Sequence, residues 1–189
     1  MAIDISQTDT SLLTQQLMDQ MSTVGFCQIV NVPGHDEDKL LSAIKAFSAI
    51  PLEDKMKLAL HHYREENTNL FHGYFPFLER DVANKEFYQL SRPVSDLSDW
   101  ERNGCPLYQD APWPQNSSEL GIDWVLEVFR DHWKRMHSIA LKIISCFAVA
   151  LGKSPHYFEP WFKNECASVF RGLHYLPRSK DVVLDNPKE

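Results

Sequence analysis

The chain has 189 residues, of which 43% are hydrophobic and 24% are charged, and its formal net charge is −7. This length is enough for one domain with a sizeable core, and the composition is ordinary for a globular protein. The negative charge and the absence of any run of lysines and arginines argue against a nucleic-acid partner and against binding to an anionic membrane.

The first predicted element is a helix near the N-terminus. Thr10 or Ser11 can serve as its N-cap, since hydroxyl side chains accept from the free backbone N–H groups of a first turn. Its apolar positions, at helical spacing, are Leu13, Leu17 and Met21. Gly25 is expected to end the helix, because glycine adopts the left-handed conformation that follows a helix C-terminus.

A strand and two helices are predicted next. Residues 26–32 form a short run with β-branched members, and Pro33 and Gly34 stop it, which is typical of a strand. A second helix is expected from about Asp36, where acidic residues favour the positive end of the helix dipole. Its apolar face consists of Leu40, Leu41, Ile44 and Phe47. Pro51 then starts a short third helix.

The middle of the chain, residues 61–121, has no helical period. Residues 70–77 and 86–90 are predicted as strands. Residues 92–121 are rich in Pro, Ser, Asp and Asn and are predicted to form a surface loop. A loop of this length is unusual in a compact domain, and long loops are often functional or lid-like.

The strongest periodicity predicts one long helix over residues 122–151. Its apolar positions, three and four residues apart, are Val125, Val128, Phe129, Trp133, Met136, Ile139, Ala140, Ile143, Ile144, Phe147 and Leu151. Gly152 is expected to end it. Ser154 then resembles an N-cap that opens a short helix through Trp161, and residues 168–175 are predicted as a final strand.

Targeting signals and cysteine pairs are not apparent. The N-terminus lacks the charged and apolar regions of a secretion signal, and the longest apolar stretch is too short to span a bilayer. The four cysteines are Cys27, Cys105, Cys146 and Cys166. Their wide spacing favours neither a disulfide framework nor a zinc site. A reduced, cytoplasmic protein is therefore predicted.

Short motifs occur in a defined order at six places along the chain. They are Ala2-Ile3-Asp4-Ile5-Ser6, Gly25-Phe26 with Asn31, Phe47 with Ile50-Pro51 and Glu53-Asp54-Lys55, Gly73-Tyr74 with Lys85-Glu86-Phe87-Tyr88, Trp113-Pro114, and Leu173-His174-Tyr175-Leu176-Pro177. In this order they resemble the N-terminal part of the isopenicillin-N-synthase-like oxygenases, which depend on iron and 2-oxoglutarate. The resemblance covers nearly the whole chain.

This resemblance implies an α+β fold: a partial double-stranded β-helix, or jelly-roll, flanked by helices that include the long one at about 122–151. Residues 1–189 are expected to form a single domain, the N-terminal part of a non-haem dioxygenase. Complete relatives use iron(II), 2-oxoglutarate and dioxygen to oxidise a small-molecule substrate. Some relatives that resemble isopenicillin N synthase itself use no 2-oxoglutarate, so the need for this cofactor stays open.

The iron ligands of such relatives are a His-x-Asp and a later histidine, held as a two-histidine, one-carboxylate set. No His-x-Asp occurs in the 189 residues, and the single His-x-Glu, at His35, lies at a predicted helix start. The chain is therefore expected to be truncated before the metal site, to contain no catalytic or metal-binding residue, and to be inactive alone. A gene fragment, a short splice form and a genuine short protein all stay open.

Tyr175 is the one cofactor-binding residue that the resemblance suggests, because the corresponding tyrosine in relatives donates its hydroxyl to 2-oxoglutarate. The other interpretation is that Tyr175 only packs in the sheet. His174 is expected to be a packed or half-exposed histidine, and Tyr74 and Phe75 are expected in the core more than in a substrate pocket. The alternative function is a non-catalytic binding protein built on the same helices and strands.

Overall fold

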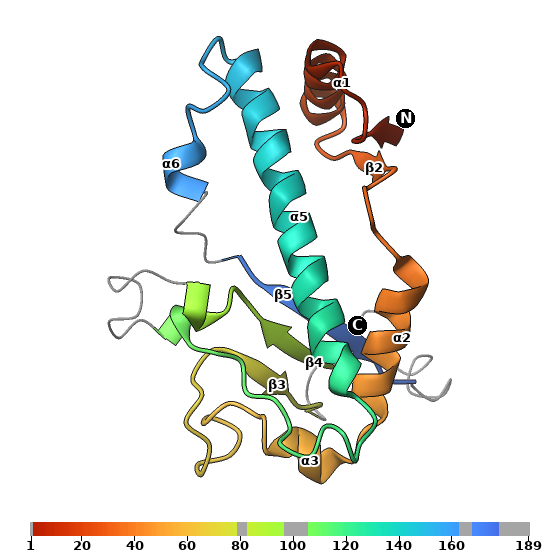
Figure 1. The fold of residues 1–189 in the computed structure, drawn as a ribbon, viewed down its shortest axis with the longest axis vertical. Helices are drawn as coiled ribbons and strands as arrows, with labels where there is room; N and C mark the ends of the chain where they lie inside the picture. The colour runs from red at the N-terminus through yellow and green to blue at the C-terminus, as the bar shows by residue number, and fades with distance from the viewer. Residues whose placement is uncertain (1, 79–82, 97–105, 163–167, 178–189) are drawn as a thin grey trace, which may run out of the picture. The chain divides into compact units, whose positions relative to one another are not determined.

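The computed structural model describes residues 2–78, 83–96, 106–162 and 168–177. The chain divides into two compact units, one formed by Met1–Glu37 with Asp131–Cys166 and the other by Asp38–Arg130 with Ala167–Glu189. Helices and strands both contribute to the fold, so the expected α+β class holds (Figure 1). Each unit is described by itself.

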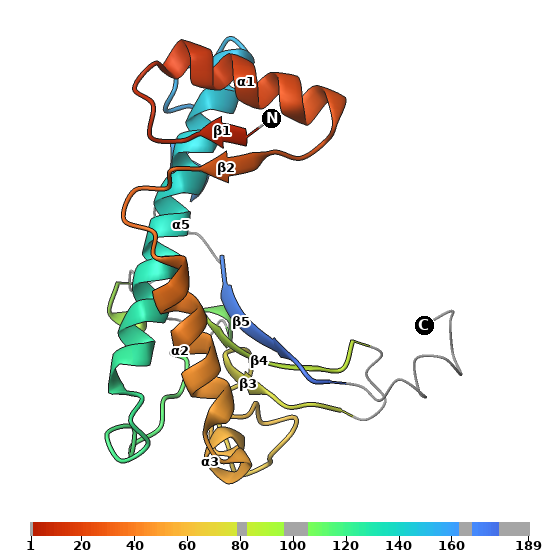
Figure 2. The same ribbon diagram turned by 90° about the vertical axis from the view of Figure 1, so that its right-hand side faces the viewer.

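The first unit has a two-stranded parallel sheet and a small apolar core. Its elements are β1 (Ala2–Asp4), α1 (Thr10–Thr23), β2 (Gln28–Val30), most of α5 (Asp123–Ala150) and α6 (Glu159–Phe162). Strands β1 and β2 lie side by side, with Ile3 opposite Ile29 (Figure 2). The buried core consists of Ile3, Ile5, Leu13, Leu17 and Cys146, with Ile139, Ile143 and Phe147 of α5 packed against it. Burial of these apolar side chains is the main stabilising contribution to the unit.

The N-cap of α1 differs from the prediction. Asp9, not Thr10 or Ser11, holds this position, and its carboxylate accepts from the backbone N–H of Leu12 at 3.0 Å. A carboxylate is a stronger acceptor than a hydroxyl at a helix N-terminus and also interacts favourably with the dipole. The other end agrees with the sequence: Gly25 has a φ of 83° and donates to the carbonyl of Gln20.

Replacing Asp9 with alanine is expected to destabilise the unit that contains α1 by about 1 kcal/mol, the usual cost of losing an N-cap. Replacing Thr10 with alanine is the control and should change the free energy of unfolding little. Urea unfolding of the two variants measures both values. An equal effect of the two substitutions would contradict the assignment of Asp9 as the cap.

Helix α5 runs from Asp123 to Ala150, one residue inside the expected 122–151 at each end. Val125 and Phe129 of its apolar face are fully buried, whereas Met136 and Ile143 are half-buried. Lys142 of α5 donates to the carbonyl of Ile5 at 2.6 Å. Among the helices of the described residues, none has the length and apolar character that crossing a membrane requires.

The second unit is built on a three-stranded antiparallel sheet. Its elements are α2 (Glu37–Ala49), α3 (Leu52–Met56), β3 (Gly73–Phe75), β4 (Lys85–Leu90), the short 3-10 helices η1 (Val94–Asp96) and η2 (Pro106–Tyr108), and β5 (Phe170–Tyr175). The strand order is β3-β4-β5. In the register, Tyr74 lies opposite Tyr88, Glu86 opposite His174, and Lys85 opposite Tyr175. Because side chains alternate along a strand, the sheet has a Glu86 face and a Tyr175 face.

The core of this unit lies on the Glu86 face, where α2 covers the sheet (Figure 2). The ring of Phe47, from α2, lies 4.8 Å from the ring of Tyr88, 5.7 Å from that of Trp113 and 6.4 Å from that of Phe129. These separations are those of favourable tilted and edge-to-face aromatic pairs. The aromatic cluster joins α2, the sheet and the start of α5 within one unit.

The backbone conformation at position 73 requires glycine. It has a φ of 126°, and a Cβ at this position would lie 2.3 Å from the carbonyl oxygen of Leu58. The next residue, Tyr74, donates its backbone N–H to the same oxygen at 2.9 Å. Only glycine allows this close approach, which explains the Gly-Tyr pair in the sequence.

Several predicted elements are shorter or shifted. The strand expected at residues 26–32 is β2, which covers only Gln28–Val30, and Phe26 is 69% exposed. The last helix begins at Glu159, and residues 155–158 before it form turns, so the prediction that this helix starts at Ser154 is wrong. The expected loop at 92–121 contains η1 and η2, and residues 97–105, with Cys105, lie outside the described part, as does Cys166.

Candidate functional site

A buried ion pair lies on the Glu86 face of the three-stranded sheet. The Lys55 ammonium, from α3, donates to both carboxylate oxygens of Glu86, at 3.0 and 2.9 Å, and to the carbonyl of Ser48 at 3.0 Å. Both charged side chains are less than 10% exposed. Burying a charge raises the free energy of the folded state unless the charge is paired and hydrogen-bonded. Here Lys55 and Glu86 are the hydrogen-bonded counter-ions of each other.

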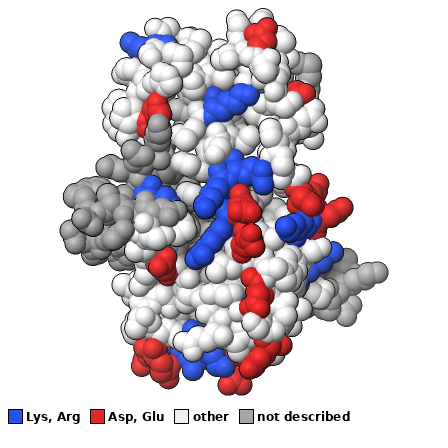
Figure 3. Space-filling view, in the orientation of Figure 1, with Lys and Arg blue, Asp and Glu red and all other residues white. Residues whose placement is uncertain are grey.

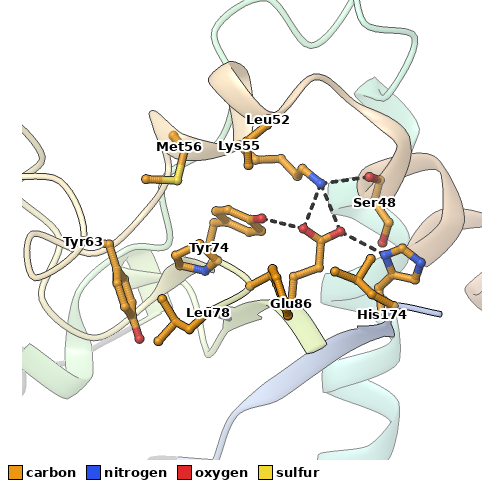
Figure 4. A pocket seen from close by; sticks show the side chains of 12 residues that line it. Ser48, Leu52, Lys55, Met56, Tyr63, Tyr74, Leu78, Glu86 and His174 are labelled. Carbon is orange, nitrogen blue, oxygen red and sulfur yellow. Dashed lines mark hydrogen bonds and ion pairs between the residues drawn. The ribbon is translucent and has the colours of Figure 1, made fainter. Parts of the chain in front are cut away.

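Two further donors complete the carboxylate of Glu86 (Figure 4). The hydroxyl of Tyr74 donates to one oxygen, and Nδ1 of His174 lies 2.9 Å from the other. Together with the two bonds from Lys55, the carboxylate accepts four hydrogen bonds, which is about its full capacity. We refer to Lys55, Tyr74, Glu86 and His174 as the carboxylate cluster.

The cluster stabilises Glu86 in its ionised form. Burial by itself would raise the pKa of Glu86, but the hydrogen bonds from His174, Tyr74 and Lys55 outweigh it and hold the pKa below the ordinary value. The pKa of Tyr74 is raised, first by burial and then by its bond to the Glu86 carboxylate. Tyr74 is therefore a neutral donor at any physiological pH.

A cavity of about 590 Å³ opens beside the carboxylate cluster (Figure 4). Its polar end is formed by the cluster and Ser48, and its remaining lining is apolar apart from the phenol of Tyr63. The apolar lining residues are Leu52, Met56, Pro76, Phe77, Leu78 and Leu176. An apolar cavity with a few polar groups at one end is the usual form of a small-molecule site.

The Tyr175 face of the sheet has a different character. Tyr175 itself is 63% exposed, at the end of β5. Farther along this face, the rings of Phe75 and Phe87 are stacked at 4.2 Å, and the Arg171 guanidinium lies 5.2 Å from the Phe87 ring centre. Because His174 and Tyr175 are neighbours on one strand, the cavity and the hydroxyl of Tyr175 are on opposite faces.

A buried histidine outside the carboxylate cluster, His72, lies in the same unit. It is fully buried, its Nε2 lies 2.9 Å from the carbonyl of Leu107, and desolvation lowers its pKa. His132, in the other unit, also has a lowered pKa, through burial and then the charges of His35 and Arg135. Both histidines are therefore held neutral by the fold.

These lowered pKa values predict a loss of stability in mild acid. Below the unfolded value of about 6.5, the unfolded chain takes up protons that His72 resists in the folded state, so the free energy of unfolding falls with falling pH. We expect His72→Asn to reduce this fall between about pH 7.5 and about pH 5.5. Urea unfolding measures it, with His156→Asn as the control, and an unchanged pH slope in the His72 variant would contradict the prediction.

The residues that the structure describes do not fit an iron site. Within residues 2–78, 83–96, 106–162 and 168–177, no group of three or more His, Cys, Asp or Glu side chains is arranged to hold a metal ion. His174, the histidine nearest to the expected cofactor residue, is committed to Glu86 through Nδ1. No catalytic step through iron is therefore assigned to these side chains.

The sequence located some of these residues and missed others. His174 was expected to be packed or half-exposed, and its side chain is 41% exposed. Tyr74 is in the core, as expected, yet it also borders the cavity. Lys55 and Glu86 belong to short segments that resemble the family, and those segments do not predict that the two residues pair. The available signal was Glu86 itself, which shares the period of the apolar residues Tyr88 and Leu90 on β4.

The comparisons with known proteins give a consistent result. The family described as "non-haem dioxygenase in morphine synthesis N-terminal" matches residues 2–116. Isopenicillin N synthase of Amycolatopsis lactamdurans is 27% identical over 132 residues, which are 69% of this chain and 39% of that protein. The chain thus spans well under half of this relative.

Two solved structures show the same fold. A full-length Neurospora crassa protein, solved in complex with alpha-KG, has a TM-score of 0.73 and 18% identity, covering 100% of this chain and 57% of that one. A Caulobacter crescentus protein, assigned to the 2OG-Fe(II) oxygenase family, has a TM-score of 0.65 and 21% identity, covering 95% and 57%. Since the family match extends over more than half of the chain, this protein belongs to the non-haem dioxygenase family, whose N-terminal region residues 2–116 match.

Proposed function

We propose that residues 1–189 are the N-terminal part of an iron(II)- and 2-oxoglutarate-dependent oxygenase, which oxidises a small molecule with dioxygen. The family match over residues 2–116 is the observation that carries this proposal. The likeness to the Neurospora crassa protein over the whole chain supports the further proposal that the β3-β4-β5 sheet is part of a jelly-roll and that residues 1–189 belong to one catalytic domain.

In this proposal the Tyr175 face of the sheet is directed toward the cofactor, and the Tyr175 hydroxyl donates to 2-oxoglutarate. The support is its position: the side chain is 63% exposed at the end of β5, within the Leu173–Pro177 segment that resembles the family motif. The 189 residues contain no His-x-Asp, so we expect no turnover from them alone. One hydroxyl donor is the contribution of this chain to binding the cofactor.

A small organic molecule is the proposed substrate class. Other structures of the Neurospora crassa protein contain thymine or 5-formyluracil, which are small molecules of this kind. The net charge of −7 gives no support to a nucleic-acid or membrane partner. On the face of the second unit that Figure 3 shows, acidic and basic side chains are intermixed. A cytoplasmic location stays a prediction.

The test begins with the coding sequence beyond the codon for Glu189. An in-frame His-x-Asp, followed by a second histidine, is the expected result. In the longer protein, Tyr175→Phe should then raise the KM for 2-oxoglutarate roughly 10- to 100-fold, because a hydrogen bond to a charged group contributes about 1.5–3 kcal/mol. The measurement is 2-oxoglutarate decarboxylation, with Tyr157→Phe as the matched control.

Two results would contradict the proposal. A stop codon directly after Glu189 in the transcript, together with stoichiometric binding of another ligand, would favour the non-catalytic binding protein. A KM for 2-oxoglutarate that Tyr175→Phe leaves unchanged would remove the role of Tyr175 while leaving the family assignment intact.

A further inference from the structure

The cavity beside the carboxylate cluster is on the sheet face that the proposed oxygenase function does not use. Its volume of about 590 Å³ lies within the range of small-molecule sites, about 300–1,000 Å³. All its lining residues belong to one unit of the chain. The chemistry of its polar end determines which ligand it accepts.

Four of the five polar groups at this end of the cavity have no hydrogen to offer a ligand. The hydroxyl of Ser48 donates to the carbonyl of Ile44 at 2.9 Å. Lys55 has three N–H donors and makes three bonds, to Ser48 and to the two oxygens of Glu86. The single hydroxyl proton of Tyr74 is donated to Glu86. The carboxylate of Glu86, which accepts four bonds, has no donor while it is ionised.

His174 is the remaining polar group of this end of the cavity. Because an ionised carboxylate only accepts, the proton shared with Glu86 must be on Nδ1 of His174. In the neutral ring Nε2 is then an acceptor, and the described residues place no hydrogen-bond partner on it. The side chain is 41% exposed, so this acceptor is open to a ligand. The polar end thus requires a hydrogen-bond donor.

The rest of the cavity requires an apolar body. Leu52, Met56 and Leu78, from α3 and from the segment after β3, line it together with Phe77 and Leu176. While the His174 ring is neutral, the charges of Lys55 and Glu86 cancel, and the cluster has no net charge to attract an anion. At the polar end, a carboxylate head would meet the lone pair of Nε2 of His174 without a donor to bind it. We propose that this cavity binds a small apolar alcohol or phenol, whose hydroxyl donates to Nε2 of His174.

Three probes of one shape test the proposal on the 189-residue chain: 2-naphthol, its methyl ether and 2-naphthoate. Only 2-naphthol combines the apolar body with a hydroxyl donor. We expect it to cause saturable NMR shifts of the Met56, Leu52 and Leu78 methyl groups. The ether and the carboxylate are expected to bind at least about tenfold more weakly, the effect of about 1.4 kcal/mol for one hydrogen bond.

Two variants check the site itself. His174→Phe keeps an aromatic ring but removes the acceptor, and should reduce 2-naphthol affinity to that of the ether. Leu78→Trp fills the cavity and should abolish binding of all three probes. His156→Phe, an exposed histidine of the other unit, is the matched control and should leave the affinities unchanged.

Several outcomes would overturn the proposal: no saturable shifts with 2-naphthol, equal or tighter binding of 2-naphthoate, or unchanged 2-naphthol affinity in either variant. If His174→Phe proves unfolded by its NMR spectrum, the ranking of the three probes and the effect of Leu78→Trp decide the question. None of these measurements uses iron or turnover, so their result is independent of the oxygenase function.

Discussion

Replacing Glu86 with glutamine is expected to lower the free energy of unfolding of its unit by about 3–5 kcal/mol. The reason is that Lys55, whose side chain is 8% exposed, would lose its buried counter-ion. In addition, the carboxylate accepts hydrogen bonds on both of its oxygens, from Lys55, Tyr74 and His174. An amide has only one accepting oxygen, because its nitrogen is a donor, so some of these bonds would be lost. Urea unfolding, followed through NMR signals of β4, measures the loss.

Two further variants separate the buried charge from the loss of a surface contact. Glu66→Gln removes an exposed partner of Arg64 and should leave the stability unchanged, since exposed ion pairs contribute little. Lys55→Met in the Glu86→Gln background removes the unpaired charge and should recover part of the stability. If Glu86→Gln unfolds at the same urea concentration as Glu66→Gln, the ion pair does not stabilise the fold.

Replacing Phe47 with alanine is expected to destabilise the same unit by a similar amount, about 3–5 kcal/mol. Phe47 is 4% exposed, and its ring contacts those of Tyr88, Trp113 and Phe129. The substitution leaves a cavity among large rigid rings that cannot collapse into the space. The change in the urea midpoint gives the loss in stability.

Leu41→Ala is the matched control for Phe47→Ala. Leu41 is on the same helix but is 44% exposed, so its removal should change the stability by less than about 1 kcal/mol. Equal losses from the two substitutions would mean that α2 does not pack on the sheet through Phe47.

The hydrophobic period of the sequence was sufficient to predict the elements that are long or strongly patterned. The three-four spacing over residues 122–151 predicted α5 to within one residue at each end, because the helical period persists over many turns. The φ of Gly25 and the end of α1 followed from glycine's tolerance of the left-handed conformation. These features depend on the local chain, which the sequence describes directly.

Periodicity did not determine which apolar residues are covered. Met21 and Leu41 lie on the predicted apolar faces of α1 and α2 but are 39% and 44% exposed, whereas Leu17 and Phe47 on the same faces are buried. A hydrophobic period identifies the side of a helix that turns inward, but the width of the covered stripe depends on the neighbouring elements. Those neighbours come from distant parts of the sequence.

The family, the long helix and the Tyr175 segment could be recognised from the sequence alone, since they depend on short motifs and local spacing. Only the tertiary structure showed that Lys55 and Glu86, 31 residues apart, form one buried pair, and that His174 completes it from a strand 88 residues beyond Glu86. The sequence alone does not distinguish a charged residue that is solvated from one that is buried against a partner. The environment of a charged residue depends on which strands and helices pack around it. The free energy of that packing is a property of the whole fold.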